Sequence, residues 1–451
     1  MKDYSLHAII VCTLVIVLLV IVSVLPDFST PYFSYKRSDI LGDVRIKEKT
    51  QKVDANKQVI VDSLTTDSFA IKKSKVGVIL PKGLVEIEDY SQDSLYLQPV
   101  YQKLNTLSSL NQPFRIAFLG DSFTECEIMT GDIREMLQEK FGGGGGGLVP
   151  LRIESAGVSP LAEVSQNSID SYSVVSKPGS NAFQSISGKY FIGRNNSEFS
   201  IRCNKFKAKT TSAAFARLLF RPLHAVDITY SKDKKSWDTV HYESDPSLKM
   251  LQINGNVNNL SFKLQQTDSI ILYGVAYDNQ NGVILDNLSL RSNSGLALSS
   301  LSNSTLNEFN KERPYDLVII QYGLNAFNTT GNYEGYKKGM IRAINHLKSA
   351  LPNARFVLFS IGDKGEMRDG EVVTNHLVPE FIQAQKEIAR QSGICFWNMF
   401  EAMGGDGTIA RWAQAEKPMA AKDFTHIAPA GGRIIAKQFV SSFLFEQKKY
   451  Q

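Results

Sequence analysis

A serine, an aspartate and a histidine stand in contexts that fit nucleophilic acyl transfer. Ser122 lies two residues after an apolar run at 114–120, and Asp423 precedes His426 by three residues. That spacing lets a carboxylate reach the imidazole of the same turn, fix its tautomer and stabilise the imidazolium that forms. Together the three side chains would supply a nucleophile, a general base and an orienting group. The sequence therefore predicts Ser122, Asp423 and His426 as a catalytic triad.

Asn325 is a candidate hydrogen-bond donor for the same chemistry. It follows a second apolar run, residues 315–323, and its amide could stabilise an oxyanion. Each of these residues could instead have a purely structural role. Ser122 could cap the helix that follows it, because serine is a common N-cap residue. Asn325 could be a turn residue, and Asp423 could cap the turn that contains His426.

The elements around these residues alternate between strands and helices. Compact apolar runs at 114–120, 282–290, 315–323, 355–361 and 394–400 are separated by segments with helical apolar spacing. This alternation predicts a parallel sheet with helices on both faces. Loops at the carboxyl ends of such strands carry the functional residues. Ser122 and Asn325 are therefore expected at the same edge of one sheet.

Residues 155–280 have a different pattern. Short alternating apolar and polar segments are separated by clusters of Asn, Gly, Asp and Ser, which predicts an antiparallel β-sandwich inserted into the α/β domain. Its aromatic residues could stack on sugars, but aromatics of a sandwich are more often core residues, so none is assigned a role. The aromatic residues considered are Tyr190, Phe191, Phe199, Trp237 and Tyr242.

The N-terminus contains an uncharged apolar segment, residues 8–26. About 20 apolar residues span a bilayer as a helix, whereas a secretory signal has a shorter apolar region and a small-residue cleavage site. "VSVLP" is a poor cleavage site, so an uncleaved transmembrane anchor is favoured over a cleaved signal. An N-terminal span followed by one long domain favours a cell-envelope location, anchored in the inner membrane with the catalytic domain in the periplasm. A cleaved signal with release into the periplasm is the alternative.

These observations divide the chain into five parts. They are a membrane anchor or signal (1–26), a polar stalk (27–84), the first part of the α/β domain (85–154), the inserted sandwich (155–280) and the second part of the α/β domain (281–451).

Composition excludes some classes of function. The net charge of +5 is spread over 50 basic and 45 acidic residues, without a long basic block, so no nucleic-acid partner is implied. Cys126, Cys203 and Cys395 lack metal-ligand spacing and are expected to be buried free thiols. Cys126, four residues after Ser122, is expected to pack beneath the site on a helix. The glycine run 142–147 should end a helix and form a loop.

Three short blocks resemble the SGNH/GDSL hydrolases: "GDS" at 120–122, "GLNA" at 323–326 and "DFTH" at 423–426. The resemblance implies a Ser122–His426–Asp423 triad and an oxyanion hole formed by the Ser122 N–H, a glycine N–H and Asn325. Gly295 is the chosen glycine, and Gly282 is a less favoured substitute. The aspartate that usually ends the asparagine block is replaced by Ala326.

A narrower resemblance concerns residues 85–445, which are similar to bacterial envelope peptidoglycan O-acetylesterases with an inserted carbohydrate-binding-like β-sandwich. It implies a membrane-anchored esterase that removes O-acetyl groups from an envelope glycan, with no metal or other cofactor. Two alternatives remain. One is an O-acetyltransferase with the same triad and a sugar hydroxyl as acceptor. The other is a non-catalytic glycan-binding envelope protein.

Overall fold

The computed structural model describes residues 28–30, 33–35, 80–152 and 159–450. Within these ranges no helix has both the length and the apolar character needed to cross a membrane. The predicted span at 8–26 lies outside them, as does most of the predicted stalk. Two short strands of that stalk, β1 (Phe28–Thr30) and β2 (Phe33–Tyr35), form an antiparallel pair.

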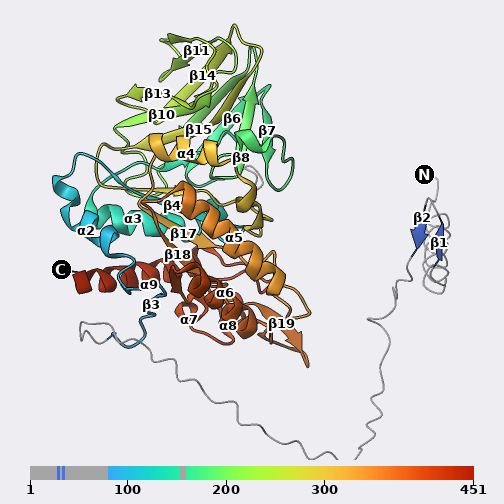
Figure 1. Ribbon diagram of the computed structural model, residues 1–451. Helices are drawn as coiled ribbons and strands as arrows, with labels where there is room; N and C mark the ends of the chain where they lie inside the picture. Colours follow the sequence, from blue (N-terminus) through green and yellow to red (C-terminus); the bar gives the residue numbers. More distant parts are fainter. Residues whose placement is uncertain (1–27, 31–32, 36–79, 153–158, 451) are drawn as a thin grey trace, which may run out of the picture. The chain divides into compact units, whose positions relative to one another are not determined.

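The central sheet of the described chain has five parallel strands and one antiparallel edge strand (Figure 1). Their order is β16 (Val283–Asn287), β4 (Phe114–Gly120), β17 (Leu317–Gln321), β18 (Arg355–Phe359), β21 (Cys395–Trp397) and β3 (Ile87–Asp89). β4 and β17 are buried at every residue, as expected for parallel strands covered on both faces. The predicted parallel sheet is confirmed, and the antiparallel strand β3 is an addition.

Helices pack on both faces of this sheet. One face is covered by α4 (Asn303–Glu312), α5 (Glu334–Ala350) and α6 (Val378–Ser392). The opposite face is covered by α2 (Gln98–Thr106), α3 (Thr130–Phe141), α7 (Met399–Met403), α8 (Thr408–Gln414) and α9 (Pro429–Gln447). A two-stranded hairpin, β19 (Gly365–Arg368) and β20 (Glu371–Thr374), follows β18.

The insert consists of two antiparallel sheets. The inner sheet contains β13 (Lys249–Asn254), β10 (Phe215–Arg221), β15 (Ile270–Asp278), β8 (Lys189–Gly193) and β7 (Asp170–Ser173), with β5 (Gly147–Val149) paired to β15. The outer sheet contains β12 (Asp238–Tyr242), β11 (Val226–Ser231), β14 (Asn259–Gln265), β9 (Glu198–Cys203) and β6 (Ala162–Asn167). Because β5 belongs to the inner sheet, the predicted sandwich start at 155 leaves out this strand.

The inner sheet is covered on both of its faces. Leu272, Val275 and other residues of one face pack against the outer sheet. Ile271 and Tyr273 point the opposite way and join the apolar cluster beneath α4 and α5. The alternation of side chains along a strand explains this division. The molecule therefore has successive layers, in which the outer sheet is separated from the α/β domain by the inner sheet.

The glycine run ends α3 and forms a loop, as predicted, but this loop is closely packed. A Cβ at Gly143 would lie 2.5 Å from the Val283 carbonyl oxygen. One at Gly145 would lie 2.2 Å from the Tyr277 carbonyl oxygen. Both distances are shorter than real Cβ atoms tolerate, and both residues have positive φ angles. Glycines thus let the chain pass from α3 to β5 directly against the backbone.

Candidate active site

One strand end and one turn bring the predicted triad together. Ser122 follows β4, whereas Asp423 and His426 lie in the turn before α9. Ser122 Oγ is 3.0 Å from His426 Nε2, and His426 Nδ1 is 2.6 Å from Asp423 Oδ2. Both distances are those of hydrogen bonds. The serine is half-buried, while the histidine and aspartate side chains are about half exposed, 43% and 50%.

Local hydrogen bonds hold the aspartate in place. Asp423 Oδ1 accepts from the backbone N–H groups of Thr425 and His426, each at 3.0 Å. Partial burial alone would raise the pKa of Asp423. The hydrogen bonds from the His426 backbone and side chain and from the Thr425 backbone outweigh burial, and the pKa lies below its usual value. The carboxylate is therefore ionised at neutral pH and can stabilise a protonated His426.

Asn325 lies at the same edge of the sheet, in the loop after β17. Its Nδ2 donates to the Asn293 backbone oxygen at 3.1 Å and to Asp121 Oδ2 at 3.3 Å. Asp121 directly precedes Ser122, so the amide is held beside the serine. Asp121 itself is fully buried, and its Oδ1 accepts from the Phe123 N–H at 2.9 Å. The sequence analysis gave no role to Asp121 or Asn293, although Asp121 is the middle residue of the GDS block and Asn293 lies two residues before Gly295.

Of the two glycine candidates, only Gly295 lies at the predicted edge of the sheet. In the free protein the Gly295 N–H donates to Asn293 Oδ1 at 2.9 Å. Its φ of 85° and a Cβ position 2.7 Å from the Tyr322 ring explain the glycine as a turn and packing residue. Gly282 precedes β16 at the opposite end of the strand, five residues and about 16 Å from the carboxyl edge. It cannot serve this site.

The loop after Ser122 corrects two predictions. The next α-helix, α3, begins at Thr130, so Ser122 is not its cap. Cys126 lies in a short 3₁₀ segment with a φ of 60°, so it does not share an α-helical face with Ser122. It is half-buried and lines a small cavity of about 60 Å³ between the two domains. Cys203 and Cys395 are buried free thiols, as predicted.

The two glutamates of this loop hold it against neighbouring elements. Glu127 Oε2 is 2.6 Å from Arg134 Nη1, and both side chains are buried. Arg134 Nε also donates to the Leu285 carbonyl oxygen of β16 at 3.0 Å. Glu125 Oε2 is 2.7 Å from Arg291 Nε, which ties the serine loop to the loop after β16. These contacts fix a loop that also has positive φ angles at Cys126 and Glu127.

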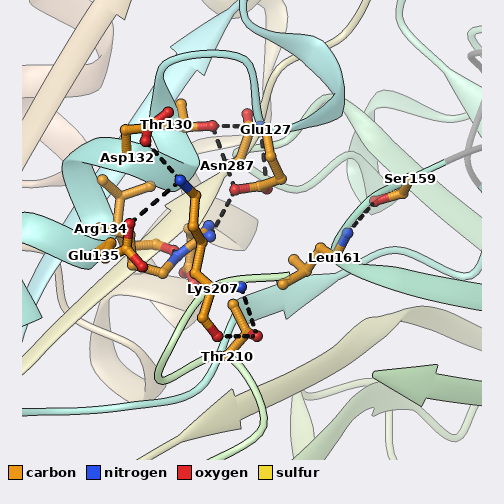
Figure 2. A network of polar contacts seen from close by, with 12 residues as sticks. Glu127, Thr130, Asp132, Arg134, Glu135, Ser159, Leu161, Lys207, Thr210 and Asn287 are labelled. Atoms are coloured by element: carbon orange, nitrogen blue, oxygen red, sulfur yellow. Dashed lines mark hydrogen bonds and ion pairs between the residues drawn. The ribbon is translucent and has the colours of Figure 1, made fainter. Parts of the chain in front are cut away.

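Ion pairs also connect the start of α3, next to the serine loop, to the sandwich. Figure 2 shows Lys207, from the loop after β9, reaching the first turn of α3. Lys207 Nζ lies 2.6 Å from Asp132 Oδ1 and 3.3 Å from Glu135 Oε2, and the lysine side chain is 9% exposed. The insert is therefore attached next to the helix that follows the serine loop.

Burial of Asp121 predicts a pH-dependent stability. Burial raises the pKa of Asp121 from 3.8 to about 7, against the opposing hydrogen bond from the Phe123 N–H. The folded chain then binds one proton more than the unfolded chain between about pH 4 and pH 7, so stability falls as pH rises through this window. For these values the loss between pH 5 and pH 8 is about 2–3 kcal/mol.

We expect Asp121→Asn to remove this loss, because asparagine does not titrate. Urea unfolding of both proteins at pH 5 and pH 8 measures it. The control is Asp93→Asn, which changes an exposed aspartate. Equal pH dependence in wild type and Asp121→Asn would show that Asp121 does not take up this proton.

Comparison with known proteins supports the fold. No family model matches the chain, and no curated protein matches it. A solved peptidoglycan O-acetylesterase superposes with a TM-score of 0.67 at 20% identity, over 80% of this chain and 99% of that one. A Bacillus subtilis protein gives a TM-score of 0.31 at 9% identity, over 63% and 90% of the two chains. A family two carbohydrate esterase from Cellvibrio japonicus gives 0.26 at 7% identity, over 64% and 99%.

The first of these likenesses extends over most of this chain, 80% of it. The two weaker likenesses add nothing to it. This chain therefore folds like a solved peptidoglycan O-acetylesterase.

Proposed function

We propose that this protein is a serine esterase that removes O-acetyl groups from a cell-envelope glycan, with peptidoglycan as the favoured substrate. The observation that carries the proposal is the continuous hydrogen-bonded line from Ser122 Oγ through His426 to Asp423, at 3.0 and 2.6 Å. Such a line lets a hydroxyl lose its proton as it attacks a carbonyl carbon. The choice of glycan takes its support from the solved O-acetylesterase of the same fold.

The reaction follows from these positions. Ser122 Oγ bonds to the acetyl carbon while His426 Nε2 takes the hydroxyl proton, and Asp423 stabilises the imidazolium. The ester C–O bond then breaks, and His426 gives its proton to the departing sugar oxygen. Water repeats the sequence on the acetyl-enzyme and releases acetate. The Ser122 N–H and the Asn325 amide are the proposed oxyanion donors. The Gly295 N–H would join them only by giving up its bond to Asn293 Oδ1, as the Asn325 amide would give up one of its own.

Asn325→Ala is expected to lower kcat by about 100- to 1,000-fold, the usual effect of removing one oxyanion donor. In the free protein the Asn325 amide bonds to Asp121 and Asn293, and one of these bonds would be exchanged for the oxyanion. Kinetics with 4-nitrophenyl acetate give kcat. Asn328→Ala, a loop asparagine three residues later, is the control and should keep wild-type kcat. A loss below tenfold for Asn325→Ala would remove this residue from the oxyanion hole.

The substrate is tested by acetate release from O-acetylated peptidoglycan and from acetylated xylan, with Ser122→Ala as the blank. We expect faster release from peptidoglycan. Faster release from xylan would reject the envelope glycan but keep the esterase. Release equal to the blank from both polymers and from 4-nitrophenyl acetate would reject the enzyme. Acetyl transfer to chitooligosaccharide that exceeds release to water would instead identify an O-acetyltransferase.

We further propose that residues 8–26 anchor the protein in the inner membrane, with the catalytic part in the periplasm. The apolar length of that segment supports this proposal. Protease treatment of spheroplasts should degrade the catalytic part, and membrane fractions should hold the full-length chain. Recovery of a shortened chain in the soluble periplasmic fraction would indicate a cleaved signal.

A further inference from the structure

A lysine lies between the two loops that carry the candidate catalytic residues. Lys364 is in the loop after β18, the strand that pairs with β17. Its Nζ donates to Thr425 Oγ1 at 2.9 Å, and Thr425 directly precedes His426. The same Nζ lies 5.9 Å from the ring centroid of Phe327, which follows Asn325 by two residues. The ammonium group therefore reaches both loops that flank the site of ester attack.

Backbone hydrogen bonds hold the loop of Lys364 in this position. The Lys364 carbonyl oxygen accepts from the Asn375 N–H at 2.7 Å, and the Gly365 N–H donates to the Phe424 carbonyl oxygen at 2.7 Å. A Cβ at Gly365 would lie 2.7 Å from Phe424 Cβ, so the two segments are closely packed. A side chain that starts from a fixed backbone can bind a ligand with defined geometry.

The Lys364 ammonium group is a half-buried cation without an ion pair. In the described part of the chain no carboxylate oxygen lies within 4 Å of its Nζ, and its one hydrogen bond is to the neutral Thr425 hydroxyl. The charge of Asp423 raises the pKa of Lys364, but partial burial outweighs it and the pKa is lowered. Both Asp423 oxygens already accept hydrogen bonds within the catalytic turn. An ammonium group has three N–H donors, so two are left for a ligand.

The chemistry of this group selects an anionic oxygen ligand. Hydrogen bonds between an ammonium group and a carboxylate are shorter and stronger than those between neutral groups. Partial burial strengthens them further, because the surrounding dielectric is lower than in water. The two flanking loops also carry the groups that act on the acetyl ester, so a carboxylate at Lys364 belongs to the sugar that carries the ester or to its immediate substituent.

We propose that Lys364 binds a carboxylate of the substrate beside the acetyl ester and so makes the site selective for acidic glycans. The inference rests on the proposed function and names a substrate class within it. Peptidoglycan carries carboxyl groups, whereas an unsubstituted acetylated xylan chain does not. The carboxylate keeps its charge throughout the reaction, so its binding should lower KM and leave kcat unchanged.

The test compares two forms of one substrate with the full-length chain in detergent. Soluble fragments of O-acetylated peptidoglycan are used directly and after their carboxyl groups have been converted to methylamides with a carbodiimide, and acetate release gives kcat and KM. We expect the wild-type KM to be at least about tenfold lower for the carboxylate form, the size expected for one charge-assisted hydrogen bond. Lys364→Met should abolish this difference with kcat unchanged, and Lys364→Arg should retain most of it. The control is Lys417→Met, an exposed lysine after α8.

Hydrolysis of 4-nitrophenyl acetate, which has no carboxylate, isolates the chemical step. All four proteins should hydrolyse it equally. A loss of kcat on this ester in Lys364→Met that is absent in Lys364→Arg would show that the cation serves the oxyanion or the catalytic turn, and would overturn the carboxylate site.

The wild-type protein alone can also decide the question if Lys364→Met does not fold. Equal wild-type KM values for the two fragment preparations would overturn the carboxylate site and keep the proposed esterase. A wild type that is inert toward both preparations and 4-nitrophenyl acetate would reject the proposed function and this inference with it.

Discussion

Replacing Ser122 with alanine should abolish ester hydrolysis almost completely. Without the Oγ atom no acetyl-enzyme can form, and His426 has no hydroxyl to deprotonate at the 3.0 Å contact. In other serine hydrolases, loss of the nucleophile lowers kcat by about 10⁶-fold. We expect a decrease of about 10⁴- to 10⁶-fold here, measured by burst and steady-state kinetics with 4-nitrophenyl acetate. The initial burst of 4-nitrophenol should also disappear.

The control for this variant is Ser299→Ala, which removes an exposed hydroxyl from a short 3₁₀ helix. It should retain wild-type kcat. Thermal unfolding should show that Ser122→Ala keeps its fold, because Ser122 is only half-buried and its side chain hydrogen-bonds, among the described residues, to His426. A Ser122→Ala protein with more than a tenth of wild-type kcat would contradict the triad, whatever its stability.

The largest effect on stability is expected from Arg313→Met. Arg313 is 2% exposed and lies between the sandwich and the α/β domain. Its Nε is 2.7 Å from Asp286 Oδ2 of β16, and its Nη2 is 2.9 Å from Asp278 Oδ1 of β15. Tyr315 OH also donates to Asp286 Oδ2 at 2.6 Å. Removing this cation would leave Asp286 with neutral donors only and Asp278 with only the more distant Arg115, whose Nη2 is 3.9 Å from Asp278 Oδ2. Breaking a buried pair typically costs about 3–5 kcal/mol.

Urea unfolding at pH 7 measures this loss. Asp286→Asn in the Arg313→Met background should recover part of it, because one uncompensated charge disappears. The control is Arg202→Met, since Arg202 and Glu163 form an ion pair in which both side chains are 59% exposed. That variant should leave the unfolding midpoint unchanged, because solvent screens exposed pairs. Equal small effects for both arginines would show that the buried cluster does not hold the two domains together.

Much of this architecture could be predicted from local sequence. The runs at β4 and β17 are apolar at nearly every position and end abruptly, which marks them as buried parallel strands. Ser122 and Asn325 follow such ends, and the three-residue spacing of Asp423 and His426 is itself a local geometry. The inserted sandwich could be recognised because its alternation differs from that of its surroundings. These are properties of short segments, which a sequence records directly.

The tertiary structure decided the contacts between segments that are distant in the chain. The backbone oxygen of Asn293 accepts from Asn325 only because β16 and β17 flank β4. The glycines of the run at 142–147 are required because the backbones of β15 and β16 lie directly beside them. Sequence periodicity determines which face of a helix or strand a residue occupies. Strand pairing and packing determine which residues from other elements it contacts. Sequence alone could therefore predict the triad but not the residues that support it.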